Sequence, residues 1–282
     1  MLRYAYNTNG CAHHRLADAL DLVAEAGYDG VALTLDWPHL DVTAGDYLAQ
    51  AGRLDAALRA RGLGLVVETG ARFVLDPRRK HEPTLMSPEA DGRARRLDFL
   101  RRAVDVCAAC GGDTVSFWSG PLRDSVEDED AWAWLTEGIA ALAEHARAAG
   151  VALSFEPEPG HHTELLADYD RLVAAVPDLR LALDLGHLLV TGEAEPADAV
   201  RAYRDRLGTV AIEDMDRGVH LHKPFGTGDL DVAACLAALR GVGYERLVTV
   251  ELSRESPRAH LAIPESVAFL RDAEARLDAD RP

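Results

Sequence analysis

The stretch VALSFEPE, residues 151–158, is a short apolar run that ends in acidic side chains. Such a run is typical of a buried strand that leaves the core at a polar surface. Seven further stretches share this design, because each of them begins apolar and ends polar. They lie at 2–7, 30–36, 63–70, 114–120, 180–187, 209–215 and 247–254. Eight strands of this kind are the number that a (β/α)₈ barrel requires.

The segments between these strands carry helical patterns. Apolar residues recur at helical spacing in 14–27, 45–62 and 130–150, and a glycine stops the last of these segments. Strands that alternate with helices along the chain predict a parallel sheet with the helices outside it. No linker, low-complexity tract or change of composition divides the sequence. We therefore predict a single α/β domain, a TIM barrel, over residues 1–282.

The composition restricts the kinds of partner. The chain has 47 acidic and 30 basic residues and a formal net charge of −17, so it repels polyanions at long range. This charge disfavours nucleic acid or an anionic membrane as the main partner and leaves a small molecule as the expected one. The sequence has no apolar run long enough for a transmembrane helix and no apolar signal-peptide core near its start. We expect a cytoplasmic protein, for which homo-oligomer formation stays open.

Three of the predicted strands end in a carboxylate, namely Glu156, Asp184 and Glu251. The carboxyl ends of barrel strands meet at one face, where active sites are built. Carboxylates that are brought together repel and raise each other's pKa, and a divalent cation relieves that repulsion. Carboxylate oxygens suit Mg²⁺ or Mn²⁺, and an added imidazole favours Mn²⁺, Co²⁺ or Zn²⁺. The alternative for each residue alone is a structural salt bridge.

Four motifs, in this order along the chain, resemble the xylose-isomerase-like TIM-barrel superfamily, which includes sugar phosphate isomerases and epimerases. They are SFEPEPG around Glu156, DLGH at 184–187, GTGDLD at 226–231 and VELS at 250–253. The segment 68–85 and the sequence IEDMDRGVH also resemble a narrower subgroup, the sugar-isomerase-like proteins encoded in Ebo-type gene clusters. The resemblance covers essentially the whole chain. It implies a divalent metal ion at the barrel mouth, with Mn, Mg, Co and Zn as candidates.

The epimerases of that superfamily hold their metal with a Glu, an Asp, a His and a Glu, and these positions correspond here to Glu156, Asp184, Ala211 and Glu251. The histidine expected on strand seven is therefore an alanine. Glu213 can replace it, because it shares the strand parity of Ala211. His222 can replace it too, because it matches a metal-binding histidine of endonuclease IV-like members, and we favour His222. Two alternatives stay open: His220 and His222 are both loop residues near an anionic substrate, or the metal has been lost.

Further residues that follow strands are expected to contact the substrate. Trp118 stands where endonuclease IV-like members carry a histidine ligand, and its indole offers a wall on which a sugar ring stacks. The basic segment 72–81 can clamp an anionic group or form a mobile lid, or else be a solvated turn. Glu68 is also a candidate ligand for a second ion. The expected substrate contacts are His187, Arg72, Trp118, His220, Arg217, Arg254 and Glu68. Residues expected to line the cleft without an assigned role are His13, His14, Asp36, His39, His161 and His162.

The resemblance implies a metal-dependent isomerase or epimerase that acts on a sugar, a sugar phosphate or a cyclitol. Glu156 and Glu251 would lie on opposite sides of the substrate, so that one removes a proton next to a carbonyl and the other returns it, through an enediolate. One alternative is a dehydratase or lyase of an inosose-like cyclitol at the same site. Another is a metal-free or non-catalytic barrel, because of Ala211. The net charge, Trp118 and Ala211 argue against an endonuclease IV-like nuclease.

Overall fold

The eight apolar stretches form the strands of one closed barrel in the computed structural model of the chain, which describes residues 1–70 and 72–279. All neighbouring strands are parallel, and their order around the barrel is β1-β10-β7-β6-β5-β4-β3-β2. The strands are β1 Arg3–Asn7, β2 Gly30–Thr34, β3 Gly64–Glu68, β4 Thr114–Phe117, β5 Ala152–Phe155, β6 Arg180–Asp184, β7 Leu207–Ile212 and β10 Leu247–Val250. The predicted (β/α)₈ barrel is therefore confirmed.

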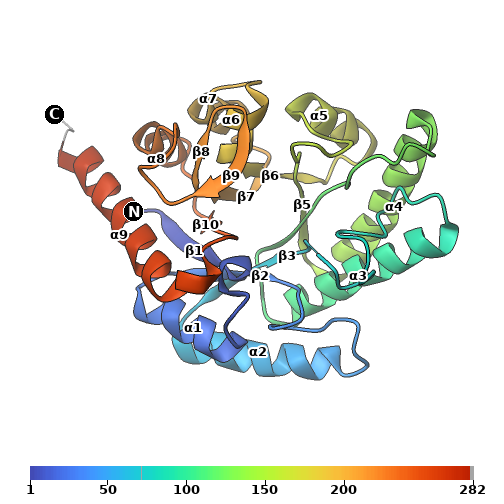
Figure 1. Cartoon of the computed structure of the whole chain (residues 1–282), viewed down its shortest axis with the longest axis horizontal. Coiled ribbons are helices and arrows are strands. Elements are labelled where there is room, and N and C mark those ends of the chain that lie inside the picture. The colour runs from blue at the N-terminus through green and yellow to red at the C-terminus, as the bar shows by residue number, and fades with distance from the viewer. Residues whose placement is uncertain (71, 280–282) are drawn as a thin grey trace.

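Helices surround the barrel and cover its outer surface (Figure 1). They are α1 Leu16–Glu25, α2 Tyr47–Arg61, α3 Ala90–Ala109, α4 Asp128–Ala149, α5 Leu166–Ala175, α6 Leu185–Thr191, α7 Pro196–Ala202, α8 Val232–Gly241 and α9 Ala259–Ala279, with 3₁₀ turns η1 Thr8–Cys11 and η2 Ser256–Arg258. Gly62 and Gly150 end α2 and α4 in the left-handed conformation, with φ of 67° and 70°, which is typical of a glycine at a helix end. No helix within the described residues is both long enough and apolar enough to span a membrane.

The alternation of side chains along the strands places the polar residues inside the barrel mouth. Ala5, Ala32, Val66 and Leu247 form a small buried cluster that is separate from the main core. Side chains two positions apart on a strand point to the same side. Asn7, Thr34 and Glu68 follow Ala5, Ala32 and Val66 by two positions, so they point to the same side, nearer the strand ends. All three line the cavity at the barrel mouth.

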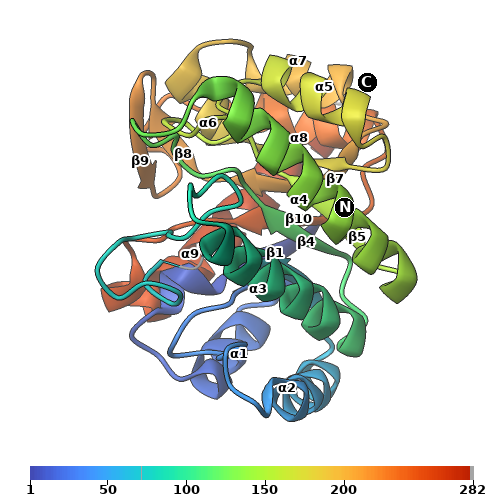
Figure 2. The ribbon, with the colours of Figure 1, turned by 90° about the vertical axis from the view of Figure 1, so that its right-hand side faces the viewer.

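A β-hairpin stands above the end of β7, where a loop was expected. It pairs β8 Asp214–Asp216 with β9 Val219–Lys223 in an antiparallel arrangement. Its turn contains Gly218, whose φ of 74° favours glycine. The sequence GVHLH is thus part of a strand, and alternation in that strand directs His220 and His222 to one side. The hairpin and the connection after β3 project from the same end of the barrel, on the left in Figure 2.

Candidate active site

A cavity of about 490 Å³ opens at the carboxyl ends of the strands. It is the expected position of a TIM-barrel active site. Its lining contains carboxylates, imidazoles and two amides, so the cavity is mainly polar. The lining residues are Asn7, Asn9, Thr34, Glu68, Gly70, Arg72, Lys80, His81, Trp118, Glu156, Glu158, His161, His187, His220, His222, Glu251, Ser253 and Arg254.

The carboxylates of the cavity are crowded. Burial, followed by the negative charges of Glu158 and Glu68, raises the pKa of Glu156 well above its usual range. Burial and the charge of Glu251 likewise raise the pKa of Glu158. The pKa of Glu68 rises to about 8, first because of burial and then because of Glu251. A set of acids that oppose each other's ionisation in this way is a site prepared for positive charge.

Several buried ligand atoms near the cavity have no hydrogen-bond partner within the described residues. They are both ring nitrogens of His187 and Nδ1 of His222, whereas the carboxyl groups of Asp184 and Glu213 lie against each other and can share a hydrogen bond. A buried polar atom without a partner is costly, so each such atom in a folded protein calls for a physical reason. Burial lowers the pKa of His187 to about 4, which leaves its ring neutral and able to offer a lone pair at neutral pH.

His187 is common to two overlapping groups of side chains that fit a metal ion. Glu156, Asp184 and His187 offer one ligand atom each, and the three atoms lie within 4.8 Å of one another. His187, His220 and His222 form a second group with the same spread. The donor set of carboxylate oxygens and imidazole nitrogens suits a divalent transition metal. The residues present therefore fit the ion that the sequence implies.

Ala211, the position of the expected histidine ligand, lies near the end of β7. Ala211 is aligned with Asp184 on one side and with Thr249 on the other. It is the only residue of β7 that is not fully buried. His222 lines the cavity, and its Nδ1 lies 3.9 Å from Oε1 of Glu213. Glu213 itself is completely buried and does not line the cavity.

Glu213 occupies a tight space behind the mouth. A Cβ at Gly186 would lie only 2.2 Å from its Oε1. Burial and the charge of Asp184 raise the pKa of Glu213 well above its usual range. We therefore expect this side chain to be protonated when no metal is bound. It lies beside Asp184 and His222, behind the wall of the cavity.

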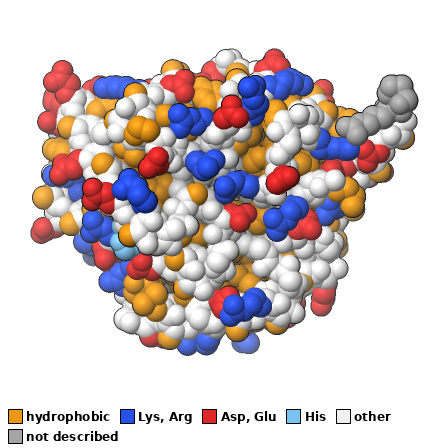
Figure 3. Space-filling view, turned by 180° about the vertical axis from the view of Figure 1, so that it is seen from behind, with side chains coloured by type: hydrophobic (Ala, Val, Ile, Leu, Met, Phe, Trp, Pro, Cys, Tyr) orange, Lys and Arg blue, Asp and Glu red, His pale blue; other side chains and the backbone are white. Residues whose placement is uncertain are grey.

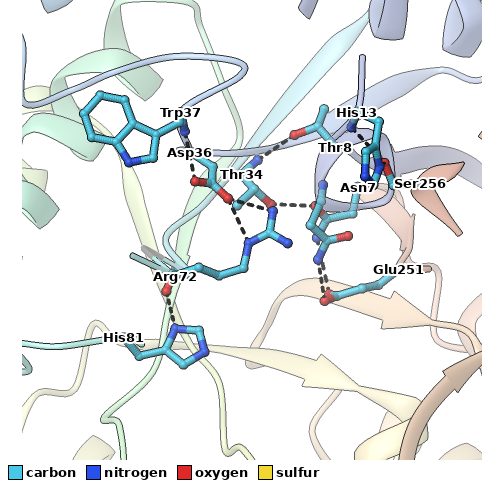
Figure 4. A network of polar contacts seen from close by, with 12 residues as sticks. Asn7, Thr8, His13, Thr34, Asp36, Trp37, Arg72, His81, Glu251 and Ser256 are labelled. Carbon is cyan, nitrogen blue, oxygen red and sulfur yellow. Dashed lines mark hydrogen bonds and ion pairs between the residues drawn. The ribbon is translucent and has the colours of Figure 1, made fainter. Parts of the chain in front are cut away.

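Glu251 is held from two sides by amide groups. Asn9 donates a hydrogen bond of 2.7 Å to its Oε1, and Asn7 donates one of 3.3 Å to its Oε2. Oδ1 of Asn7 accepts in turn from the hydroxyl of Thr34 at 2.7 Å, so the orientation of Asn7 is fixed as well. Figure 4 shows this chain of contacts from β2 through β1 to Glu251.

The basic segment after β3 divides into paired and unpaired cations. Arg72 lines the cavity but binds Asp36, with its Nη2 2.6 Å from Oδ2 (Figure 4). Arg79 pairs with Asp76 on the exposed part of the segment. Lys80 reaches the cavity and is exposed. The expectation of Arg72 as an anion clamp is therefore weakened, because a carboxylate already neutralises it.

Trp118 forms one wall of the cavity and is itself held in place. The guanidinium carbon of Arg96 lies 4.5 Å from the ring centroid. The rings of His81 and His161 approach edge-on with centroid distances of 4.9 Å each. Burial lowers the pKa of His81 to about 4 and that of His161 to about 3. The wall thus offers an aromatic surface beside two neutral imidazoles.

Several expected residues lie elsewhere. Arg217 turns away from the cavity, and its Nη2 is 3.0 Å from both oxygens of Glu195. The prediction of a substrate contact by Arg217 is therefore not supported, because this residue lies in the turn of the hairpin and its guanidinium binds Glu195. Of the residues without an assigned role, only His161 lines the cavity, while the other five do not: His13, His14, Asp36, His39 and His162.

Sequence reasoning missed Glu158 and the two asparagines. Oε1 of Glu158 lies 3.8 Å from Nε2 of His220, and its Oε2 lies 3.9 Å from Nδ1 of His187. A signal was available, because Glu158 follows Glu156 by two positions in the motif EPE and can share its side of an extended segment. Asn9 stands in a short 3₁₀ turn, for which the sequence offers no comparable periodicity.

Known proteins share both the sequence pattern and the fold. The chain is 28% identical over 242 residues to an L-ribulose 3-epimerase of Mesorhizobium japonicum, covering 83% of this chain and 74% of that protein. It is 26% identical over 193 residues to an inosose dehydratase of Lacticaseibacillus casei, covering 59% of this chain and 63% of that protein. The crystal structure of the IOLI protein with a bound zinc atom has the same fold, with a TM-score of 0.76 and 16% identity, over 98% of this chain and 99% of that one.

A family model also matches most of the chain. The model of the xylose isomerase-like TIM barrel family matches residues 20–273, which include every strand of the barrel except β1 and all of the proposed metal ligands. The resemblance of the strand-end motifs is thereby confirmed at the level of the family. The chain belongs to the xylose isomerase-like TIM barrel family.

Proposed function

We propose that this protein is a metal-dependent isomerase or epimerase of a sugar or cyclitol. One observation carries the proposal: Glu156 and Glu251 end strands that lie on different sides of the barrel mouth, and orphaned ligand atoms are grouped between β5 and β7. A pair of carboxylates across a polar cavity is suited to moving a proton on and off one carbon atom. The similarity to an L-ribulose 3-epimerase supports the same class of reaction.

The metal would be held by Glu156, Asp184, Glu251 and His222. His222 would supply from the hairpin the imidazole that position 211 lacks. When bound, such an ion polarises a carbonyl and its neighbouring hydroxyl, which makes the adjacent carbon atom more acidic. The imidazole in this set favours Mn²⁺, Co²⁺ or Zn²⁺ over Mg²⁺.

The chain's own groups would carry the proton. Glu251 would act as one base, because Asn7 and Asn9 fix its two oxygens in place. Glu156 would hold the proton on the other side of the substrate carbon, and the two would exchange roles in the reverse direction. Glu158, with its raised pKa, would donate a hydrogen bond to a substrate oxygen. Its position beside His187 and His220 places it within the same polar wall.

The remaining walls would bind and orient the substrate. Trp118 would stack on a ring or carbon chain, and the neutral imidazoles of His81 and His161 would bond to hydroxyl groups. His187 would contact the substrate from the start of α6, where Asp184 accepts a hydrogen bond from its backbone N–H at 2.9 Å. The residues 72–81 would form one rim of the opening.

Incubation of the metal-loaded protein with ketopentoses, ketohexoses and inososes in D₂O tests the proposal. Proton transfer through the solvent-exchanging carboxylates should give an isomer of unchanged composition that carries deuterium at the reacting carbon, seen by NMR and mass spectrometry. A product that forms without solvent deuterium would contradict proton transfer. A complete lack of turnover across these three classes, with the metal bound, would contradict the substrate class.

A dehydratase is the second candidate. The similarity to an inosose dehydratase favours it, and so does the raised pKa of Glu158, because a protonated carboxyl can supply the proton that a leaving hydroxyl needs. The same D₂O experiment separates the two reactions. A product lighter by one water would identify the dehydratase.

A further inference from the structure

A second cavity, of about 600 Å³, lies at the opposite end of the barrel. Its lining includes the first residues of three strands, Arg3 of β1, Arg180 of β6 and Leu207 of β7. Asp113 and Arg246, which directly precede β4 and β10, complete this end. The cavity therefore spans the amino ends of the strands, whereas the carboxylate-rich site lies at their carboxyl ends. A ligand in this cavity would be remote from the proposed reaction.

Arginines from four separate parts of the chain converge on this cavity. Within the described residues, no acceptor bonds to the guanidinium groups of Arg3, Arg180 or Arg246, whereas Arg204 lies 3.7 Å from the neighbouring Asp205. Guanidinium groups without an internal acceptor are available to an external one.

Two arginines near the same end of the barrel, Arg206 and Arg271, do have acceptors within the protein. Arg206 donates a hydrogen bond of 2.8 Å to the carbonyl of Pro177. Arg271 donates to the carbonyl of Leu2 at 2.8 Å and to Asp29 at 2.9 Å. Within the described residues, Arg3, Arg180 and Arg246 differ from these two in having no such acceptor.

Two of the arginines, Arg3 and Arg180, lie close to glycines of other strands. A Cβ at Gly64 would lie 3.4 Å from Nη2 of Arg3, so this guanidinium lies over the start of β3. A Cβ at Gly208 would lie 2.0 Å from Oγ of Ser154 and 2.8 Å from the Cβ of Arg180, so Arg180 leaves the backbone close beside β7. Arg3 and Arg180 both begin within barrel strands, which fixes where their side chains leave the backbone.

The local charge of the cavity has the opposite sign to that of the chain. Four arginines and two carboxylates, Asp113 and Glu245, line it, which gives 4 − 2 = +2 in a protein of net charge −17. Figure 3 shows the face opposite to that of Figure 1, and Lys and Arg side chains gather near its middle. Within the described residues, neither carboxylate lies within 4.0 Å of an arginine of the cavity.

We propose that this cavity, at the amino ends of the strands, binds a small anion with two or more negative charges, such as a phosphate ester or a dicarboxylate. Planar guanidinium groups bind both kinds of oxyanion through paired hydrogen bonds. The ligand would lie among Arg3, Arg180 and Arg246, with Arg204 at the edge. This site is independent of the proposed isomerase reaction.

Isothermal titration calorimetry with inorganic phosphate and, separately, with succinate tests the site. The metal-loaded full chain at about 150 mM NaCl should bind at least one of the two anions saturably at this cavity, because close guanidinium contacts persist where long-range attraction is screened. Binding of phosphate alone would identify phosphate esters as the ligand class, and binding of succinate alone would identify dicarboxylates. The lack of saturable binding of either anion would overturn the proposal.

Matched variants locate the binding. R180Q/R246Q should weaken the affinity about tenfold or more, because it removes two charge-assisted contacts. R53Q/R276Q makes the same change in net charge at two exposed arginines elsewhere and should leave the affinity within about twofold. R246Q alone serves if the double variant unfolds. Equal loss in the two double variants, or loss only in K80Q/R254Q at the barrel mouth, would overturn the assignment to this cavity.

Discussion

At the scale of single residues, the proposal depends on two carboxylates with different surroundings. Glu251 receives hydrogen bonds from two asparagine amides, whereas Glu156 lies among other acids that raise its pKa. Environments that differ in this way are what separates a base from an acid in a two-carboxylate site.

Glu156→Gln and Glu251→Gln should each lower kcat by about 10²-fold or more, because each removes a proton-transfer group and a metal ligand. The fold should survive, since glutamine has nearly the same shape and the substitution relieves crowding of negative charge. Circular dichroism and thermal melting check the fold, and the D₂O assay checks turnover. Near-wild-type activity in either variant would show that the two-carboxylate assignment is wrong.

Which side chains pair with one another was the least predictable feature. The sequence identified the residue types at the strand ends, and Glu156, Glu251, His187, His220 and His222 all line the cavity. It could not show that Arg72 is neutralised by Asp36, or that Arg217 binds Glu195. Such pairs join segments distant in sequence, and their geometry depends on loops without periodicity.

At the scale of elements, the strands were predictable because each is a short apolar run with a polar end. The polar residues lie at or just beyond the strand termini, as in β5, which ends at Phe155 before Glu156. The hairpin of β8 and β9 was not predictable, because its sequence is polar and its pairing is set by tertiary contacts. One of these contacts joins Asp214 of β8 to the motif GTGDLD at 226–231.

Asp214 at the start of β8 anchors the segment that follows the hairpin. Its Oδ2 accepts hydrogen bonds from the backbone N–H groups of Gly226, Thr227 and Gly228, and its Oδ1 accepts from that of Leu230. A Cβ at Gly228 would lie 2.4 Å from Oδ1 of Asp214, which explains the glycine at that position of the motif.

Asp214→Ala should lower the free energy of unfolding by about 2–4 kcal/mol, because four backbone N–H groups, one of them buried and three part-buried, lose a charged acceptor. It should also weaken metal binding, because the hairpin that carries His222 loses its support. Asp216→Asn is the matched control in the same strand. Asp216 binds Lys223 at 2.8 Å and is 44% exposed, so its loss should cost at most about 1 kcal/mol. Similar effects of the two changes on metal affinity would argue against this role of Asp214.

At the scale of the whole molecule, the barrel has two ends of opposite electrical character. Carboxylates crowd the carboxyl ends of the strands, and arginines gather at the amino ends. The crowded carboxylates make stability depend on pH. A carboxyl whose pKa is raised by folding binds its proton more tightly in the folded state, so its contribution to stability is lost as the pH rises toward the folded pKa.

Removal of the metal should therefore destabilise the protein more at about pH 8 than at about pH 6.5. Glu68, with a pKa of about 8 in the folded protein, should cost the metal-free form up to about 1.4 kcal/mol per pH unit in this interval. Melting curves with and without a chelator measure the effect, and Glu68→Gln is the control that should flatten the dependence in the metal-free form. A chelator effect that shrinks as the pH rises would contradict this electrostatic reasoning.

The metal content of three purified proteins, measured by inductively coupled plasma mass spectrometry, tests most directly whether the hairpin completes the site. Wild type should carry about one divalent ion per chain. His222→Ala should carry clearly less, whereas His220→Ala should lose less than His222→Ala does. The double variant A211H/H222A should regain the ion, because it returns an imidazole to the end of β7. Full metal content in His222→Ala, or a wild-type protein without any divalent ion, would contradict the proposed metal site.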